Sequence, residues 1–291
     1  MLSNRFAVVV KGGLLMRFAK MHGLGNDFVM VNGFKEKLPD DLNRLAIAVC
    51  DRHLGIGADG LIVLCPADQD ATARFLIYND DGSQAESCGN GLRCAALFAK
   101  QEGITTDNDF IFELVNGIAK PSIVDEQKGI VRVDMDKPRL APKQIPAHFS
   151  GSQVVSQPLL VGDQTYAVTL VSMGNPHCVI FVDDTDSFPV REIGPLVETH
   201  PAFPQKTNVE FIKVLDQERL QMRVWERACG ETLACGTGAC AAMVAASLNG
   251  YIGRHAEVIL RHGSLDVEWA VDEHIYMTGP ATLVAEGDYK L

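Results

Sequence analysis

The sequence lacks any apolar run of the roughly 20 residues that a membrane-spanning helix requires. It also lacks an export signal, because the short apolar stretch 6–10 is interrupted by Lys11. Met16-Arg17-Phe18 resembles a second start, so residues 1–15 are interpreted as an N-terminal extension. We therefore expect a cytoplasmic protein with no membrane partner.

Positive charge is scarce as well. The chain has 26 Lys and Arg against 37 Asp and Glu, a net charge of −11, which argues against nucleic acid as a partner. No Cys-x-x-Cys spacing occurs and His is not clustered with Cys, so no metal site is expected. Eight cysteines in a chain of this size without an export signal are expected to stay reduced.

An internal repeat divides the 291 residues into two halves, and domains of about 140 residues are of ordinary size. Residues 75–96 and 222–242 share one order: a β-like run, a polar turn, and Cys-Gly-x-Gly opening an Ala-rich helix. Cys88 and Cys235 are 147 positions apart (235 minus 88), and Gly-Asn pairs ending at Asn26 and Asn175 are 149 apart (175 minus 26). Two echoes at nearly one spacing indicate duplication.

The local patterns predict an α+β fold in which short strands outnumber helices. Helices are expected at 42–50, 91–100, 193–198 and 238–248. Strands are expected at 28–31, 61–64, 110–114, 130–135, 166–170, 179–182, 209–214, 258–260 and 265–269. The proline-rich stretch 137–158 is the predicted boundary between the halves.

The Cys-Gly-x-Gly motifs carry chemistry because of where they stand. A helix N-terminus has unpaired backbone N–H groups and a partial positive charge, which should lower the pKa of a thiol placed there. The glycines allow close approach of a carboxylate to those N–H groups. Two such units acting on one α-carbon could remove a proton with one sulfur and return it with the other, which is racemisation or epimerisation.

The remaining cysteines are interpreted as inert packing residues, the commonest role of free Cys. They are Cys50, Cys65, Cys94, Cys178, Cys229 and Cys240.

Taken in order, the motifs resemble those of the diaminopimelate epimerase family from Met16 to Leu291. They are Met21-His-Gly-Leu-Gly-Asn-Asp-Phe28, Gly55-Ile-Gly-Ala-Asp-Gly60, Asn79-Asp-Asp-Gly82, Ser87-Cys-Gly-Asn-Gly-Leu-Arg-Cys94, Ser172-Met-Gly-Asn-Pro-His177, Thr207-Asn-Val-Glu-Phe211, Trp225-Glu-Arg227 and Ala234-Cys-Gly-Thr-Gly-Ala-Cys240. A single Cys-Gly-x-Gly would be a weak signal, whereas eight segments in order are specific.

The resemblance implies two structurally similar domains related by pseudo-twofold duplication, each a β-sheet wrapped around a central helix. The N-terminal epimerase domain would comprise 16–136 plus 276–291, and the C-terminal one 137–275. A last strand near 275–291 would return to the N-terminal domain.

The resemblance also implies the reaction: conversion of LL-2,6-diaminopimelate to its meso form without pyridoxal phosphate or another cofactor, in lysine and peptidoglycan precursor synthesis. Cys88 and Cys235 would be the acid/base pair. The implied substrate-binding residues are Asn26, Asn79, Gly89, Asn90, Asn175, Asn208, Glu226, Arg227, Gly236 and Thr237.

Their chemistry fits these roles. Arg227 suits the distal carboxylate, Glu226 suits an ammonium group, and Asn can both donate and accept. His177 could tune a thiolate or simply bond a strand end, while His22 and Asp59 are interpreted as structural supports. Gly60 departs from family members with a polar side chain such as Gln there, which leaves one substrate contact unassigned.

Three alternatives stay open from the residues. A proline or hydroxyproline racemase of the same fold would also use two cysteines, although proline has no second carboxylate for Arg227. A redox protein could use Cys88 and Cys235 as a regulatory disulfide, and a binding module would need the carboxylate cradle without the sulfurs. A homodimer is the default expectation, and the near-symmetric motifs do not say which cysteine is the base in the LL-to-meso direction.

Overall fold

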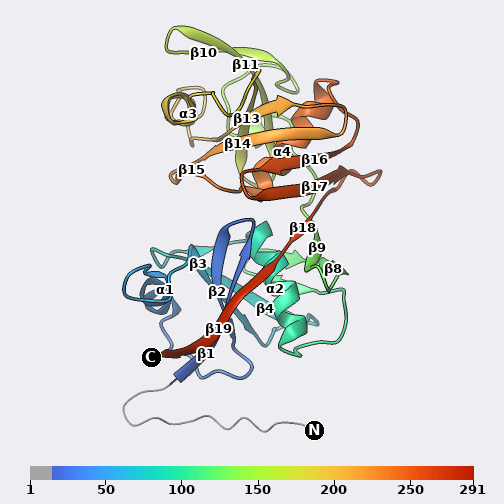
Figure 1. The fold of residues 1–291 in the computed structure, drawn as a ribbon. Helices are drawn as coiled ribbons and strands as arrows, with labels where there is room; N and C mark the ends of the chain where they lie inside the picture. The colour runs from blue at the N-terminus through green and yellow to red at the C-terminus, as the bar shows by residue number, and fades with distance from the viewer. Residues whose placement is uncertain (1–14) are drawn as a thin grey trace. The chain divides into compact units, whose positions relative to one another are not determined.

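The computed structural model describes residues 15–291, which form two compact units (Figure 1). Unit 1 contains the described residues up to Val131 together with Ala281–Leu291, and unit 2 is Arg132–Pro280. The proposed extension 1–15 lies outside the described residues except for Leu15, which begins the first strand. Unit 1 ends at residue 131, five residues before the end expected at 136. It resumes at residue 281, five residues after the start expected at 276.

Unit 1 is one sheet with two helices. Its strand order is β19-β1-β2-β3-β4-β6-β7, with β5 paired to β4. The strands of this sheet are β1 (Leu15–Gly23), β2 (Asn26–Asn32), β3 (Gly60–Cys65), β4 (Ala73–Asn79), β5 (Gln84–Ala85), β6 (Phe112–Leu114), β7 (Gly117–Ala119) and β19 (Thr282–Lys290). The residues of β8 (Pro121–Asp125) fall in unit 1, but this strand belongs to the second sheet. The helices are α1 (Leu42–Cys50) and α2 (Gly89–Gln101).

Unit 2 repeats this plan. Its sheet runs β10-β11-β12-β13-β14-β16-β17-β18-β9-β8, with β15 paired to β14. The strands are β9 (Ile130–Asp134), β10 (Gln157–Val161), β11 (Gln164–Ser172), β12 (Pro176–Phe181), β13 (Asn208–Val214), β14 (Arg219–Glu226), β15 (Gly230–Thr232), β16 (His255–Leu260), β17 (Gly263–Trp269) and β18 (Ile275–Pro280). The helices are α3 (Val190–Glu198), α4 (Gly236–Leu248) and the short 3₁₀ turn Pro142–Gln144.

The strand registers show that the two units are copies. In unit 1, Ile77 pairs with Ala85, and adding 147 to both gives Val224 and Thr232, which pair in unit 2. The parallel pair β2–β3 has its counterpart in the parallel pair β12–β13. The predicted duplicated α+β fold is therefore confirmed.

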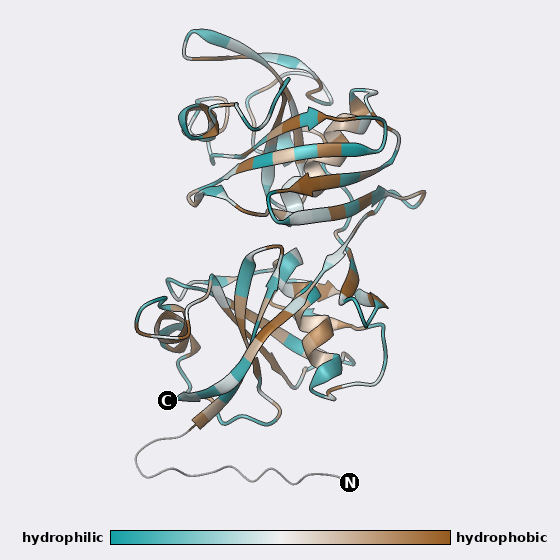
Figure 2. Ribbon diagram, viewed as in Figure 1, coloured by the Kyte–Doolittle hydropathy of each residue, from teal (hydrophilic) through white to brown (hydrophobic). Residues whose placement is uncertain are grey.

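Each sheet wraps a central helix because those helices are apolar on nearly every side. All of α4 from Gly238 to Ala246 is buried, and this helix packs against every strand from β11 to β18 except β15. The strands follow the period of two that a half-buried sheet requires: β14 alternates buried and more exposed positions, seen as brown and teal bands in Figure 2. None of the helices within residues 15–291 has the length and apolarity needed to cross a membrane.

Several sequence expectations differ in detail, among them α3, which begins three residues before the predicted 193–198. The helices α2 and α4 begin two residues earlier than expected, because the motif cysteines themselves cap them. The strand expected at 110–114 is shorter, Phe112–Leu114. The last strand expected near 275–291 is two strands: β18 belongs to unit 2, and only β19 pairs with β1 in unit 1.

Gly194 offers a test of the packing in unit 2. A Cβ at this position in α3 would lie 2.6 Å from Trp225 Cγ. Overpacking of this kind costs about 1–3 kcal/mol, so Gly194→Ala should lower the urea midpoint even though Ala is the better helix former. Intrinsic fluorescence reports unit 2, since both tryptophans, Trp225 and Trp269, lie there.

The matched control is Gly253→Ala, where a Cβ would meet nothing within 4 Å. It should change stability by no more than about 0.5 kcal/mol. Equal effects of the two variants would contradict the packing described for α3.

Candidate functional site

The two motif cysteines occupy the same local geometry, one in each unit. Cys88 is the N-cap of α2 and Cys235 is the N-cap of α4, both with extended backbone. Each sulfur accepts a hydrogen bond from the third helical N–H, at 3.5 Å from Gly91 N and 3.3 Å from Gly238 N. Sulfur thus takes the place of the usual Ser, Thr or Asp cap.

The last glycine of each motif lies close against a side chain of its sheet. A Cβ on Gly91 would lie 2.9 Å from Ile62 Cδ1, and one on Gly238 would lie 2.8 Å from Glu210 Oε1. Both helices therefore begin in close contact with their sheets. This accounts for the last glycine of the motif in both copies.

In unit 1 the sulfur of Cys88 lies among amide side chains. Its Sγ is 3.8 Å from Asn26 Oδ1, and that oxygen also accepts from Asn90 Nδ2 at 3.1 Å. Asn90 Oδ1 in turn accepts from Arg93 Nη2 at 3.0 Å. Arg93 is fully buried, and sequence reasoning gave it no role; its signal was a charge inside an Ala-rich helix.

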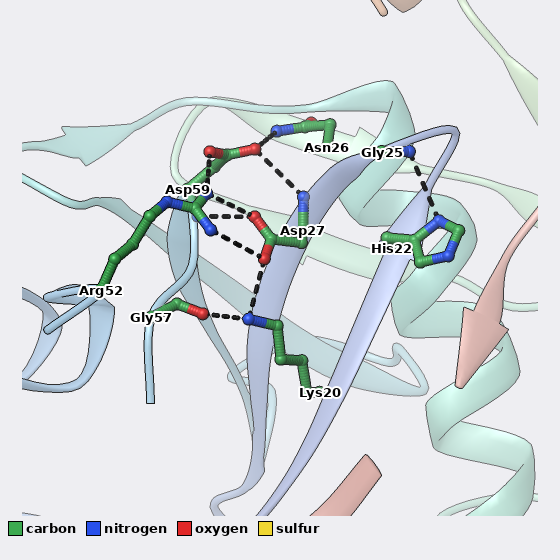
Figure 3. Close-up of polar contacts among 8 residues, drawn as sticks. All are labelled: Lys20, His22, Gly25, Asn26, Asp27, Arg52, Gly57 and Asp59. Carbon is green, nitrogen blue, oxygen red and sulfur yellow. Dashed lines mark hydrogen bonds and ion pairs between the residues drawn. The ribbon is translucent and has the colours of Figure 1, made fainter. Parts of the chain in front are cut away.

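Asn26 is attached to a network of charged residues at the start of β2 (Figure 3). Its Nδ2 donates to Asp59 Oδ2 at 2.8 Å, and Arg52 bridges Asp59 and Asp27 at 2.7 and 2.9 Å. Lys20 pairs with Asp27 at 2.9 Å. Burial alone would raise the pKa of Asp27, but the hydrogen bonds from Arg52 and Lys20 lower it below its usual value, so its carboxylate is charged at neutral pH.

Other predicted residues of unit 1 lie near the turns that flank this network. His22 Nδ1 accepts from Gly25 N at 3.4 Å, consistent with a supporting role in the β1–β2 turn (Figure 3). Asn79 ends β4, is exposed, and donates to Ser83 Oγ at 2.9 Å. No described hydrogen bond joins the Asn79 side chain to Cys88 or Asn26. Gly89 and Asn90 form the first turn of α2.

In unit 2 a hydrogen-bonded chain leads from the sheet to Cys235. Glu210 Oε1 lies 2.7 Å from His177 Nδ1, and His177 Nε2 lies 2.9 Å from Asn175 Oδ1. Asn175 Nδ2 donates to Thr237 Oγ1 at 3.2 Å, and that hydroxyl is 3.5 Å from Cys235 Sγ. The chain links four residues that were given a role from the sequence, and it adds Glu210, which stands in one of the motifs but was given no role.

The Glu210–His177 pair is wholly buried, with both side chains at 0% exposure. Burial raises the pKa of Glu210 even though His177 acts against this. Oε2 of Glu210 has no hydrogen-bond partner within residues 15–291. The signal for Glu210 in the sequence was a single carboxylate in the apolar run 209–214.

Burial also decides the state of Cys235. The pKa of this thiol is raised well above its ordinary value, first by burial and then by the carboxylates of Glu226 and Glu210. Hydrogen bonds from Thr237 and Gly238 act in the opposite direction but do not compensate. The expectation that the helix N-terminus lowers the pKa is therefore wrong for Cys235, because desolvation destabilises the buried thiolate more than the helix N-terminus stabilises it.

The predicted ligands Asn208, Glu226 and Arg227 lie together where β14 ends. Asn208 Oδ1 accepts from Arg227 N at 2.9 Å, and Asn208 Nδ2 donates to Pro176 O at 2.9 Å. Both polar atoms of the Asn208 side chain are therefore bonded to backbone groups. Glu226 accepts a short hydrogen bond from Thr232 Oγ1.

Glu198 fixes the turn that carries Glu226 and Arg227. It accepts from Trp225 Nε1 at 2.7 Å and from Ala228 N at 3.1 Å. Ala228 has a φ of 65°, a conformation that needs support in a residue other than glycine. Sequence reasoning missed Glu198, since nothing in the sequence marks it as close to this turn.

The other cysteines are mostly buried, as expected. Burial raises the pKa of Cys50 and Cys94 to about 12 and that of Cys178 well above its ordinary value, so these thiols are inert. Cys240 is buried and Cys65 partly buried, whereas Cys229 is exposed in the turn after Arg227. The expectation of a buried Cys229 is wrong, because this residue lies in the exposed turn between β14 and β15.

Comparison with known proteins agrees with this geometry. The family model of diaminopimelate epimerase matches residues 18–141 and 169–284. The chain is 53% identical to the diaminopimelate epimerase of Moorella thermoacetica over 279 residues, which covers 95% of this chain and 100% of the relative. It is 51% identical to that of Pelotomaculum thermopropionicum over 277 residues, covering 94% and 99%.

Solved structures share the fold at low sequence identity. A PhzF-family phenazine biosynthesis protein from Bacillus anthracis has a TM-score of 0.68 at 16% identity, with 95% of this chain and 99% of that chain covered. A hydroxyproline epimerase from Agrobacterium vitis has a TM-score of 0.65 at 15% identity, with 95% and 93% covered. Similarity at this level establishes the fold alone.

The raised pKa of Cys235 yields a testable consequence for its reactivity. Removing the carboxylate charge in Glu226→Gln should lower that pKa and speed alkylation of Cys235 by iodoacetamide at pH 8. We expect a rate increase of about 3- to 10-fold, since one pKa unit is a tenfold change in thiolate below the pKa. Mass spectrometry of the peptide containing Cys235 measures the rate.

The control is Glu257→Gln, which removes a carboxylate on β16 that does not contribute to the pKa shift of Cys235. It should leave the rate unchanged. No acceleration in Glu226→Gln would mean that burial alone sets the reactivity.

Proposed function

Because the chain belongs to the diaminopimelate epimerase family, we propose that it interconverts LL-2,6-diaminopimelate and meso-diaminopimelate without pyridoxal phosphate. The observation that carries this proposal is the paired placement of Cys88 and Cys235 as N-caps of equivalent helices. This reaction belongs to lysine and peptidoglycan precursor synthesis.

In this proposal the two sulfurs act on one α-carbon. One thiolate removes the α-proton, and the other thiol delivers a proton to the opposite face, so the carbon inverts. Charge then develops on the adjacent carboxylate. The N–H groups of Gly89, Asn90, Gly236 and Thr237 stand in the first turns of α2 and α4, where unpaired backbone donors and the helix dipole can stabilise that charge.

The remaining ligands would hold the other end of the substrate, which carries a second carboxylate and ammonium group. Arg227 would bind the distal carboxylate through its guanidinium, and Glu226 an ammonium group. Asn26, Asn79, Asn175 and Asn208 would complete the set. Their supports are the Asp59 and Glu210–His177 networks and the Glu198 turn.

We further propose a homodimer in the cytoplasm. Functional thiols require a reducing compartment. Among the described strands of unit 1, β19 stands at one end of the sheet, and its Leu283 and Val284 are exposed. This strand edge is suited to pairing with a second copy of the chain.

The alternatives are less well supported. Identity of 51–53% to diaminopimelate epimerases exceeds the 15% to a hydroxyproline epimerase. The Glu226–Arg227 pair has no use for proline, which lacks a second charged end. A disulfide between the two motif cysteines is expected to inactivate the enzyme.

Isotope exchange tests the reaction. Reduced protein in deuterated water without pyridoxal phosphate should convert LL-diaminopimelate to the meso form with loss of the α-proton signal by NMR. Cys88→Ala and Cys235→Ala should each reduce epimerisation by about 10³-fold, since each removes an acid/base group. Cys65→Ala, outside the proposed site, should change the rate less than about 2-fold.

Exchange with proline or hydroxyproline instead would keep the two-thiol chemistry and overturn the substrate. Absence of exchange with any of these amino acids would overturn the epimerase proposal itself.

Arg227→Lys tests recognition of the distal carboxylate. Lysine keeps the charge but loses the two-pronged geometry, so KM should rise about 10- to 100-fold with a smaller change in kcat. Arg219→Lys at the start of β14 is the matched control because Arg219 pairs with Asp216 at the surface. An unchanged KM in Arg227→Lys would exclude Arg227 from the substrate site.

A further inference from the structure

The amide side chains beside Cys88 belong to a hydrogen-bonded chain with a single direction. Donation runs from Arg93 to Asn90, from Asn90 to Asn26, and from Asn26 to Asp59. The guanidinium at one end can only donate, and an ionised carboxylate at the other end can only accept. Neither amide can turn over without setting a donor against a donor or an acceptor against an acceptor.

This direction fixes what the sulfur meets. Asn26 presents Oδ1, and not its amino group, to Cys88 Sγ at 3.8 Å. The only charged group that contacts the Asn26 side chain in the described structure is Asp59, at 2.8 Å (Figure 3). The position of the oxygen near the thiol therefore depends on Asp59.

Asp59 is itself held firmly. Its backbone N–H donates to Asp27 O at 2.9 Å, its Oδ2 accepts from Asp27 N at 3.1 Å, and its Oδ1 accepts from Arg52 at 2.7 Å. The parallel register that pairs Phe28 with Gly60 brings the start of β2 beside the residue before β3. The motif residues Asn26 and Asp59, far apart in sequence, meet for that reason.

In unit 2 the corresponding asparagine is oriented by a different residue. Asn175, the counterpart of Asn26, is oriented by His177 at 2.9 Å. The position equivalent to Asp59 is Thr207, whose hydroxyl bonds Asn208 O instead. A carboxylate at position 59 is thus a specific feature of the Cys88 half, not a general requirement of the fold.

From this geometry we propose that Asp59 is a positioning residue for the acid/base chemistry of Cys88, acting through the Asn26 amide. This inference rests on the proposed epimerase function. Asp59 contacts the Asn26 side chain and keeps its Oδ1 in place beside the sulfur.

A double-mutant cycle tests the coupling. Asp59→Ala should reduce kcat/KM for diaminopimelate by about 10- to 100-fold, as expected for loss of a group that orients a reacting one. In an Asn26→Ala background the same change should add less than about 2-fold, because the residue it positions is gone. Full additivity of the two losses would overturn the proposal.

Two further variants separate orientation from charge. Asp59→Asn should recover most of the activity, since two donors, Asn26 Nδ2 and Asp27 N, favour an amide oxygen at the Oδ2 position. Arg52→Ala, which removes the ion pair but keeps the contact with Asn26, should cost less than about 3-fold. If Asp59→Asn is as impaired as Asp59→Ala, the negative charge and not the position of Asn26 is what matters, and the proposal fails.

Alkylation of Cys88 gives a readout that does not need the substrate. Loss of the oxygen acceptor near the sulfur disfavours the thiol, so Asp59→Ala should speed reaction with iodoacetamide at pH 8 by about 3- to 10-fold. Asp59→Asn should match the unsubstituted protein. An unchanged Cys88 rate in Asp59→Ala would overturn the proposal, whereas absence of epimerisation in the unsubstituted protein would overturn only the proposed function.

Discussion

Both Cys-Gly-x-Gly motifs depend on one packing constraint: each helix begins so close to its sheet that a Cβ on its third residue would lie under 3 Å from a side-chain atom of the sheet. Gly91 against Ile62 and Gly238 against Glu210 meet this constraint in the same way. The close approach sets the capping sulfur and the free N–H groups of the first turn at the ends of the strands. Cys-Gly-x-Gly is therefore a packing motif and a chemical motif at once, since another capping residue would keep the geometry but not supply a thiol.

That constraint brings a conflict between two electrostatic effects. A helix N-terminus favours an anion by about 0.3–1 kcal/mol at exposed sites, whereas burial can shift a pKa by up to about 3–5 units at about 1.4 kcal/mol each. At Cys235 burial prevails, and Glu226 and Glu210 add to it. The helix end supplies donors for a negative charge on a ligand, but it does not by itself keep this sulfur ionised.

The sequence predicted the parts of the molecule that depend on local pattern. The repeat of 147 residues anticipated the matching registers of β4–β5 and β14–β15, and the helix Leu42–Cys50 was predicted with its observed ends. The local patterns did not predict which residues far apart in the sequence contact one another. Asp59, Glu198 and Glu210 act on residues 33, 30 and 33 positions away, through strand registers and turns that no local signal specifies. The pKa of Cys235 was missed for the same reason, because burial is a property of the packed unit and not of the motif.

The two units keep the same backbone arrangement, but the side chains of the sheet near each sulfur differ. By register, His177 and Glu210 in unit 2 correspond to Phe28 and Ile62 in unit 1, so a buried acid/base pair replaces two apolar side chains. In the proposed reaction the two thiols need equivalent geometry but opposite protonation at any moment, and identical surroundings would not distinguish the two sulfurs. Beside Cys88, the Asn26 side chain donates to Asp59 and turns its oxygen toward the sulfur. Beside Cys235, His177 donates to Asn175, and Asn175 donates to the Thr237 hydroxyl oxygen. The Thr237 hydroxyl can then donate its own proton to the sulfur. The same backbone thus places two equivalent sulfurs under different controls, which is how a nearly symmetric scaffold can give them different roles.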